Sequence, residues 1–159
     1  ILSPEAKKKY ISDMIGEIEG GWQDFCLESS GDINIKEDPG GLKDVNNSLL
    51  LFKTLYELET CNQREIMEQI KNRETQLVPF LGELGETVDF LKIFRDLYRI
   101  MVAGDDRIEF RYIEEISNLM GLNPGRPQVP IRTLLHGHLT RNKKAIKGLL
   151  SFIKNSFFN

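Results

Sequence analysis

The feature that most restricts how this chain can fold is the spacing of its apolar residues, which repeats at helical intervals along almost the whole sequence. Ile11, Ile15 and Ile18, for example, follow one another three or four positions apart, as on one face of an α-helix. The pattern recurs at about 42–59, 84–102, 110–120 and 130–157 and in a segment that begins at Asn62. It predicts an all-α fold, namely a bundle of five to seven helices with a long carboxy-terminal helix.

Capping residues predict where two of these helices begin. Ser3 followed by Pro4 is typical of an N-cap with proline at the first helical position. Asn62, with Glu65 three residues later, has the pattern of a capping box.

Glycine and proline predict where helices are interrupted. We expect the pair at 20–21 to interrupt the first helix near its end. Residues 75–85 contain Pro79 and two glycines, which favour a short, broken helix before the strong one at 84–102.

Length and composition narrow the class of protein. A chain of 159 residues suits a single domain, and a formal net charge of −3 argues against general nucleic-acid binding, which usually needs a basic face. No apolar run approaches the roughly 20 residues that a membrane span needs, so no membrane partner is expected. Two cysteines without a zinc-binding spacing favour reduced thiols and a cytoplasmic location.

The two histidines, His136 and His138, are poor candidates for a shared metal site. On one helix, residues two positions apart point about 200° away from each other. We therefore expect both to lie at the helix surface or at the edge of the core.

Residues 28–41 depart from the helical pattern. Residues 33–36 alternate apolar and polar side chains, as a short extended piece does, and Gly40 and Gly41 then open the helix expected at 42–59. Glycines let a backbone approach another surface closely, and the N–H groups at the start of a helix suit an anion. Lys36 and Lys43 flank that helix start, so the segment is compatible with phosphate binding.

Three acidic residues, Glu37, Asp38 and Asp44, accompany these lysines and could favour a hydrated divalent cation. One interpretation is therefore a contact with a triphosphate bound to Mg²⁺. The simpler interpretation is a Gly-Gly helix start with nearby acids that favour the helix dipole. The residues alone leave both open.

The run at 35–44, IKEDPGGLKD, resembles the IKEGPGGLRD signature of bacterial PII uridylyltransferases; glutamine-synthetase adenylyltransferases and related nucleotidyltransferases carry looser forms of it. Residues 104–110 are similar to the family's GREDRLxF, and residues 116–122 resemble its LAxxLGY, in the same order. The resemblance extends from about residue 33 to the end of the chain. Lys43 stands where the family has arginine, which keeps the charge but loses the bidentate fork.

The resemblance implies a helical substrate-binding domain. Residues 1–159 would be a single helical domain and a fragment C-terminal to a nucleotidyltransferase catalytic domain of the same protein. Lys36, Gly40, Gly41 and Lys43 would contact the phosphates of the nucleotide, and Asp44 would orient a lysine or approach the metal. The whole protein would use Mg²⁺ and a nucleoside triphosphate to transfer UMP or AMP to an acceptor such as PII or glutamine synthetase.

Catalysis by this chain alone is not expected. Nucleotidyl transfer in this superfamily needs a Gly-Ser turn followed by Asp-x-Asp on a β-sheet to hold two metal ions, and the sequence has neither motif. Adjacent acids at a helix end point apart, so Asp105 and Asp106 are expected to be structural and no metal site is predicted within the chain. Arg107 is expected to pair with Asp105, Asp106 or Glu109.

Two alternatives remain at this stage. The chain could be a helical interaction domain of a signalling protein whose nucleotidyltransferase part is degenerate. It could also be an unrelated all-α adaptor in which the Gly-Gly motif is a coincidence.

Overall fold

The computed structural model describes residues 2–25, 32–102, 106–121 and 131–159. Within these ranges the chain forms six α-helices, two short 3₁₀ helices and two strands, so the predicted all-α class with a long carboxy-terminal helix is confirmed. In chain order the elements are α1 (Pro4–Gln23), β1 (Ile33–Asn34), α2 (Leu42–Tyr56), α3 (Gln63–Arg73), η1 (Thr75–Leu77), α4 (Val78–Val102), β2 (Arg107–Ile108), η2 (Phe110–Tyr112), α5 (Ile113–Leu119) and α6 (Ile131–Phe157).

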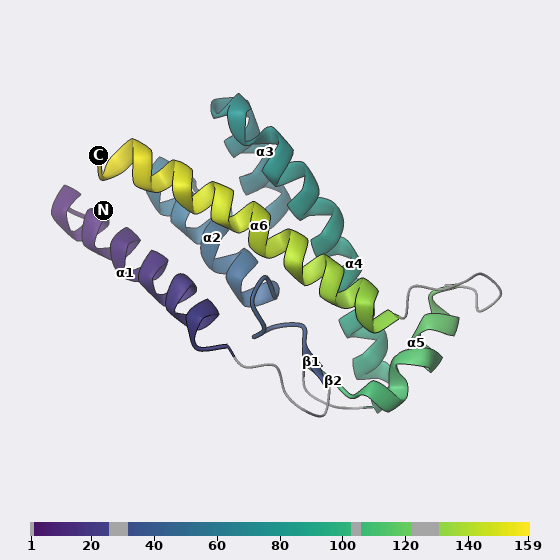
Figure 1. The fold of residues 1–159 in the computed structure, drawn as a ribbon. Coiled ribbons are helices and arrows are strands. Elements are labelled where there is room, and N and C mark those ends of the chain that lie inside the picture. The colour runs from purple at the N-terminus through teal and green to yellow at the C-terminus, as the bar shows by residue number, and fades with distance from the viewer. Residues whose placement is uncertain (1, 26–31, 103–105, 122–130) are drawn as a thin grey trace.

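The long helix α6 organises the bundle. It crosses the molecule diagonally in Figure 1, packs most extensively against α4 and also contacts α2. Helix α2 in turn lies against α1 and α3. Both ends of the chain lie at the same end of the bundle, while α5 lies near the opposite end (Figure 1). None of the helices in the described ranges is long and apolar enough to cross a membrane.

Both predicted helix starts are confirmed, although the N–H of Asn62 donates to Thr60 Oγ1 at 3.1 Å and not to Glu65, as a capping box would require. Ser3 Oγ accepts a hydrogen bond from the N–H of Ala6 at 3.2 Å, with proline at the first helical position. Asn62 Oδ1 accepts from the N–H groups of Arg64 and Glu65 at 3.0 and 3.3 Å. These contacts satisfy N–H groups that have no partner inside the helix.

The predicted interruptions are wrong in two places. Helix α1 continues through the glycine pair to Gln23, and the expected broken helix is a short 3₁₀ turn that leads directly into α4. Pro79 lies in the first turn of α4, where a missing N–H costs no helical hydrogen bond. Each glycine inside α4 costs about 1 kcal/mol relative to alanine. Burial of Leu81 and Leu84 in the core offsets that cost.

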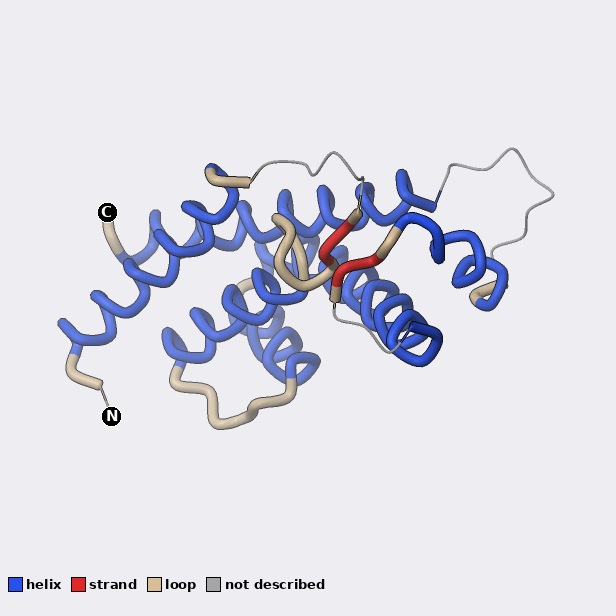
Figure 2. The backbone as a smooth tube through the Cα atoms, turned by 90° about the horizontal axis from the view of Figure 1, so that it is seen from below, coloured by secondary structure: helices blue, strands red, loops and turns tan. Residues whose placement is uncertain are grey.

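The two strands connect distant parts of the chain. They pair antiparallel, with Ile33 opposite Ile108 and Asn34 opposite Arg107 (Figure 2). The N–H of Ile35 extends this pairing by donating to the carbonyl oxygen of Asp106 at 3.0 Å. The extended piece predicted at 33–36 is thus a strand only at Ile33–Asn34, and residues 35–36 already belong to the following turn. Ile33, Ile35 and Ile108 are fully buried, so this segment is held by the core as well as by hydrogen bonds.

Candidate anion-binding site

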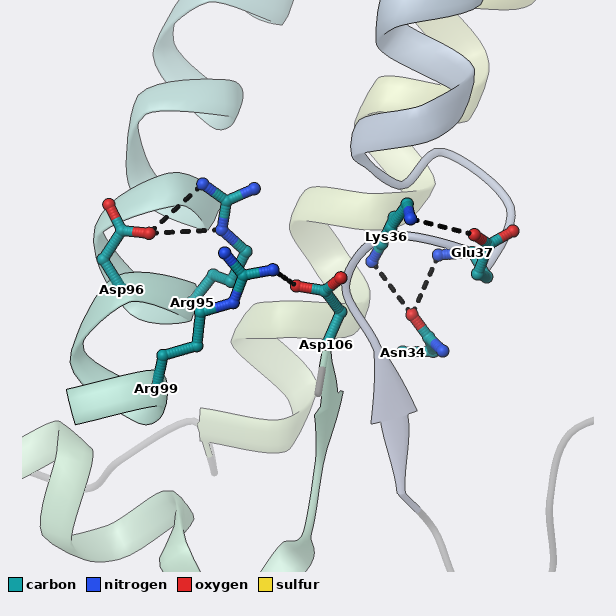
Figure 3. Close-up of polar contacts among 7 residues, drawn as sticks. All are labelled: Asn34, Lys36, Glu37, Arg95, Asp96, Arg99 and Asp106. Carbon is teal, nitrogen blue, oxygen red and sulfur yellow. Dashed lines mark hydrogen bonds and ion pairs between the residues drawn. The ribbon is translucent and has the colours of Figure 1, made fainter. Parts of the chain in front are cut away.

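The segment that follows β1 is a tightly hydrogen-bonded turn. Asn34 Oδ1 accepts from the N–H groups of Lys36 and Glu37 at 3.1 and 2.9 Å (Figure 3). The side chain of Asp38 in turn accepts from the N–H of Asn34 at 3.0 Å. Asparagine and aspartate form such turns because their short side chains reach backbone groups two to four residues away. The backbone around Lys36 is therefore fixed.

Gly40 and Gly41 are required by close contacts with the surrounding backbone. Gly40 has a φ of +83°, and a Cβ there would collide with the carbonyl oxygen of Leu139 and lie 2.8 Å from the N of Lys143. A Cβ on Gly41 would lie 2.6 Å from the carbonyl oxygens of Ile35 and Lys36. The close approach expected of these glycines is thus toward α6 and toward their own turn.

The sequence suggested that the N–H groups at the start of α2 are free to bind an anion, but two of them are used within the protein. The N–H groups of Leu42 and Lys43 donate to the carbonyl oxygens of Ile35 and Lys36 at 2.9 and 3.1 Å. That expectation is corrected because the turn folds back over the helix end and takes up these donors itself. Any anion at this position must be held mainly by side chains.

Asp44 lies in the first turn of α2 and joins three segments. Its Oδ2 accepts from Trp22 Nε1 of α1 at 2.6 Å and from the N–H of Gly40 at 2.9 Å. Burial raises the pKa of this carboxyl group above its usual value, although both hydrogen bonds oppose the shift. These contacts give Asp44 a structural role, and its orientation of a lysine or approach to a metal stays a prediction.

Lys36 and Lys43 share one carboxylate. Glu37 Oε1 lies 3.7 Å from Lys36 Nζ, and Glu37 Oε2 lies 3.2 Å from Lys43 Nζ. The lysine side chains are 53% and 45% exposed. Exposed ion pairs of this kind contribute at most about 1 kcal/mol, so a stronger anion can displace Glu37.

Both lysines line a surface hollow of about 290 Å³ between α2, α3 and α4, which we call the basic hollow. Two further cations and two amides line it as well. Its polar lining residues are Lys36, Lys43, Asn46, Gln63, Lys92 and Arg95.

Sequence reasoning missed Lys92 and Arg95 as site residues. They are three positions apart and therefore share one face of α4. Lys92 interrupts the apolar run at 90–94 and Arg95 follows that run directly, and this was the signal that could have marked them. Their proximity to the motif lysines depends on how α4 packs and cannot be found from the motif.

The second motif segment has a structural role at the edge of this region. Asp106 Oδ1 accepts from Arg99 Nη2 at 2.6 Å, which ties β2 to α4 (Figure 3). Arg107 lies in β2, and Glu109 pairs with Arg111 at 2.8 Å. The structural role expected of Asp106 is consistent with these contacts. Asp105 lies outside the described residues.

The histidine and cysteine that the sequence analysis considered as metal ligands or reactive groups, His138 and Cys61, do not line the basic hollow. His138 is at the core edge, as expected, and stacks on Phe90 with ring centroids 4.1 Å apart. Cys61 is a free thiol, and Cys26 lies outside the described residues. Within the part of the chain that the structure describes, no group of three or more His, Cys, Asp or Glu side chains could hold a metal ion.

Comparisons with protein-family models, curated proteins and solved structures found no match to this chain.

Proposed function

We propose that this chain is the helical substrate-binding domain of a nucleotidyltransferase and that Lys36 and Lys43 contact the phosphates of the nucleotide. The transferred group would be UMP or AMP, and the acceptor a regulatory protein such as PII or glutamine synthetase. Catalysis would depend on a preceding domain of the same protein, together with Mg²⁺ and a nucleoside triphosphate. The proposal includes a cytoplasmic location, which the low cysteine content favours.

The observation that carries the proposal is the basic hollow. The two lysines of the resembling motif lie in a concave surface with two more cations, in a protein whose formal net charge is −3. Concentrated positive charge in a hollow attracts anions and raises their local concentration. The pairing of β1 with β2 adds support, because it joins the first resembling segment to the second.

The test is nucleotidyl transfer by the protein that contains both domains. Label from α-³²P-UTP and α-³²P-ATP would be followed onto purified PII and glutamine synthetase. Lys36→Ala and Lys43→Ala should each lower kcat/KM by roughly ten- to hundredfold, since a hydrogen bond to a charged group is worth about 1.5–3 kcal/mol. Lys147→Ala, which removes an exposed lysine from α6, is the matched control and should retain full activity.

Unchanged turnover in both site variants, with melting temperatures equal to that of the parent, would reject the phosphate-binding role of the lysines. Absence of transfer to either acceptor would favour the second candidate, a helical interaction domain beside a degenerate nucleotidyltransferase. The observation in favour of that candidate is the apolar surface of α4, where Ile93 and Ile100 are 54% and 80% exposed.

A further inference from the structure

Lys92 and Arg95 enter the basic hollow from α4, whereas Lys36 and Lys43 come from the turn after β1 and from the first turn of α2. The hollow therefore has two pairs of cations on different elements. Its volume of about 290 Å³ is far larger than the ~30 Å³ share of one liquid water molecule. A ligand with more than one anionic group can be accommodated.

The charges of the α4 pair are only partly neutralised within the protein. Lys92 Nζ donates to Gln63 Oε1 at 2.7 Å, and this partner carries no charge. Arg95 Nε and Nη2 both lie 3.2 Å from Oδ1 of Asp96, whose side chain is 60% exposed (Figure 3). The Arg95 side chain itself is 24% exposed. A contact between adjacent residues whose carboxylate is largely solvated contributes little to stability and leaves the guanidinium able to bind another anion.

The charge balance of the whole hollow is positive. Four cations line it, and two carboxylates, those of Glu37 and Asp96, form ion pairs with members of the set. A third carboxylate, that of Asp44, is buried and interacts with the charge of Lys43. The cations therefore outnumber the carboxylates around the hollow, and this excess of positive charge favours an anionic ligand.

We propose that Lys92 and Arg95 are the second half of the anion site, where they contact a different phosphoryl group of the ligand from the one at Lys36 and Lys43. This inference rests on the proposed function, because it takes the phosphate-binding role of the two motif lysines as given. It assigns the hollow to an oligophosphate chain that extends from α2 to α4. The planar guanidinium of Arg95 would bind two oxygens of one phosphoryl group at once.

The test is calorimetric titration of the 159-residue chain with inorganic triphosphate, pyrophosphate and phosphate at low ionic strength. We expect triphosphate to bind more tightly than phosphate by at least tenfold. Lys92→Ala and Arg95→Ala should each weaken triphosphate binding about tenfold, and the double variant should bind triphosphate no better than phosphate. Lys71→Ala is the matched control, because it removes a cation of α3 that pairs with Glu68 outside the hollow, and it should leave binding unchanged.

Three results would overturn the inference: no triphosphate binding to the unaltered chain, equal affinity for phosphate and triphosphate, or full affinity in the Lys92→Ala/Arg95→Ala variant. If in the last case Lys36→Ala and Lys43→Ala still weaken binding, the proposed function stands and only the extension to α4 fails. Failure of the proposed function is seen separately, in the transfer assay. Melting temperatures of all variants distinguish lost binding from lost folding.

Discussion

Gly40 lies where the turn after β1 meets α6, and its lack of a side chain is what allows the two to touch. Its backbone has a positive φ of 83°, and the carbonyl of Leu139 and the N–H of Lys143 occupy the space a Cβ would need. Gly82, in contrast, lies inside α4, and beyond the adjoining backbone of that helix nothing lies within 4 Å of the position a Cβ would take. The same substitution therefore has opposite consequences at these two glycines.

We predict that Gly40→Ala lowers the free energy of unfolding by about 2–5 kcal/mol, because it adds backbone strain to a steric collision. Gly82→Ala should raise it by up to about 1 kcal/mol, since alanine is the better helix former. Urea denaturation followed by circular dichroism measures both. If both variants unfolded at the same urea concentration, the close contact between Gly40 and α6 would not be needed for stability.

Between elements, one buried amide joins α4, α6 and the turn. Asn142 of α6 donates from Nδ2 to the carbonyl oxygen of Gly40 at 3.1 Å, and its Oδ1 accepts from the hydroxyl of Thr87 on α4. Asn142 is fully buried, and every buried polar side-chain atom within the described residues has a partner. Buried polar groups without partners are costly, so this contact selects one arrangement of the three segments.

Replacing Asn142 with alanine should therefore cost about 1–3 kcal/mol, chiefly because the Gly40 carbonyl loses its side-chain donor. The Thr87 hydroxyl also loses an acceptor but can still donate to the carbonyl oxygens of Glu83 and Leu84, each 3.1 Å away. Asn155→Ala, at an exposed position near the end of the same helix, is the matched control and should change stability by less than about 0.5 kcal/mol. Chemical denaturation of the two variants checks this. A loss of the same size in both would rule out the bridging role of Asn142.

Elements also differ in how far the sequence predicts them. The starts of α1 and α3 were predictable because Ser3 and Asn62 act on N–H groups within three residues of themselves. The continuity of α4 was not, because burial of its apolar residues outweighs the local preference of Gly82 and Gly85. Tertiary packing also limits what the motif can show. The motif identified Lys36 and Lys43 as site candidates, but Lys92 lies near them only because α4 packs beside α2.

Across the whole molecule, the stability should depend on pH through His138. Burial, followed by the nearby Arg141, lowers the pKa of this histidine below its ordinary value of 6.5. Below pH 6.5 His138 therefore binds a proton more readily in the unfolded chain than in the folded chain. The stability contributed by the neutral imidazole is complete above that pH and is lost as the pH falls toward the lowered pKa.

We expect the free energy of unfolding to decrease between pH 7.5 and pH 5 and the decrease to be smaller in His138→Phe, which keeps the aromatic stack on Phe90. His136→Gln serves as the control for the other histidine. Urea titrations at several pH values give the slope for each protein. An unaltered slope in His138→Phe would assign the pH dependence to other groups.

The hydrogen bond from Asn142 to Gly40 also has a consequence for the order of events during synthesis. These residues are 102 positions apart, and domains emerge from the ribosome amino terminus first. Lys36 and Lys43 are therefore made long before the helix that holds their turn in place. Closing so long a loop is entropically unfavourable until α4 and α6 have packed. A nascent chain that stops before α6 lacks the support for this turn, so the anion site is a late product of folding.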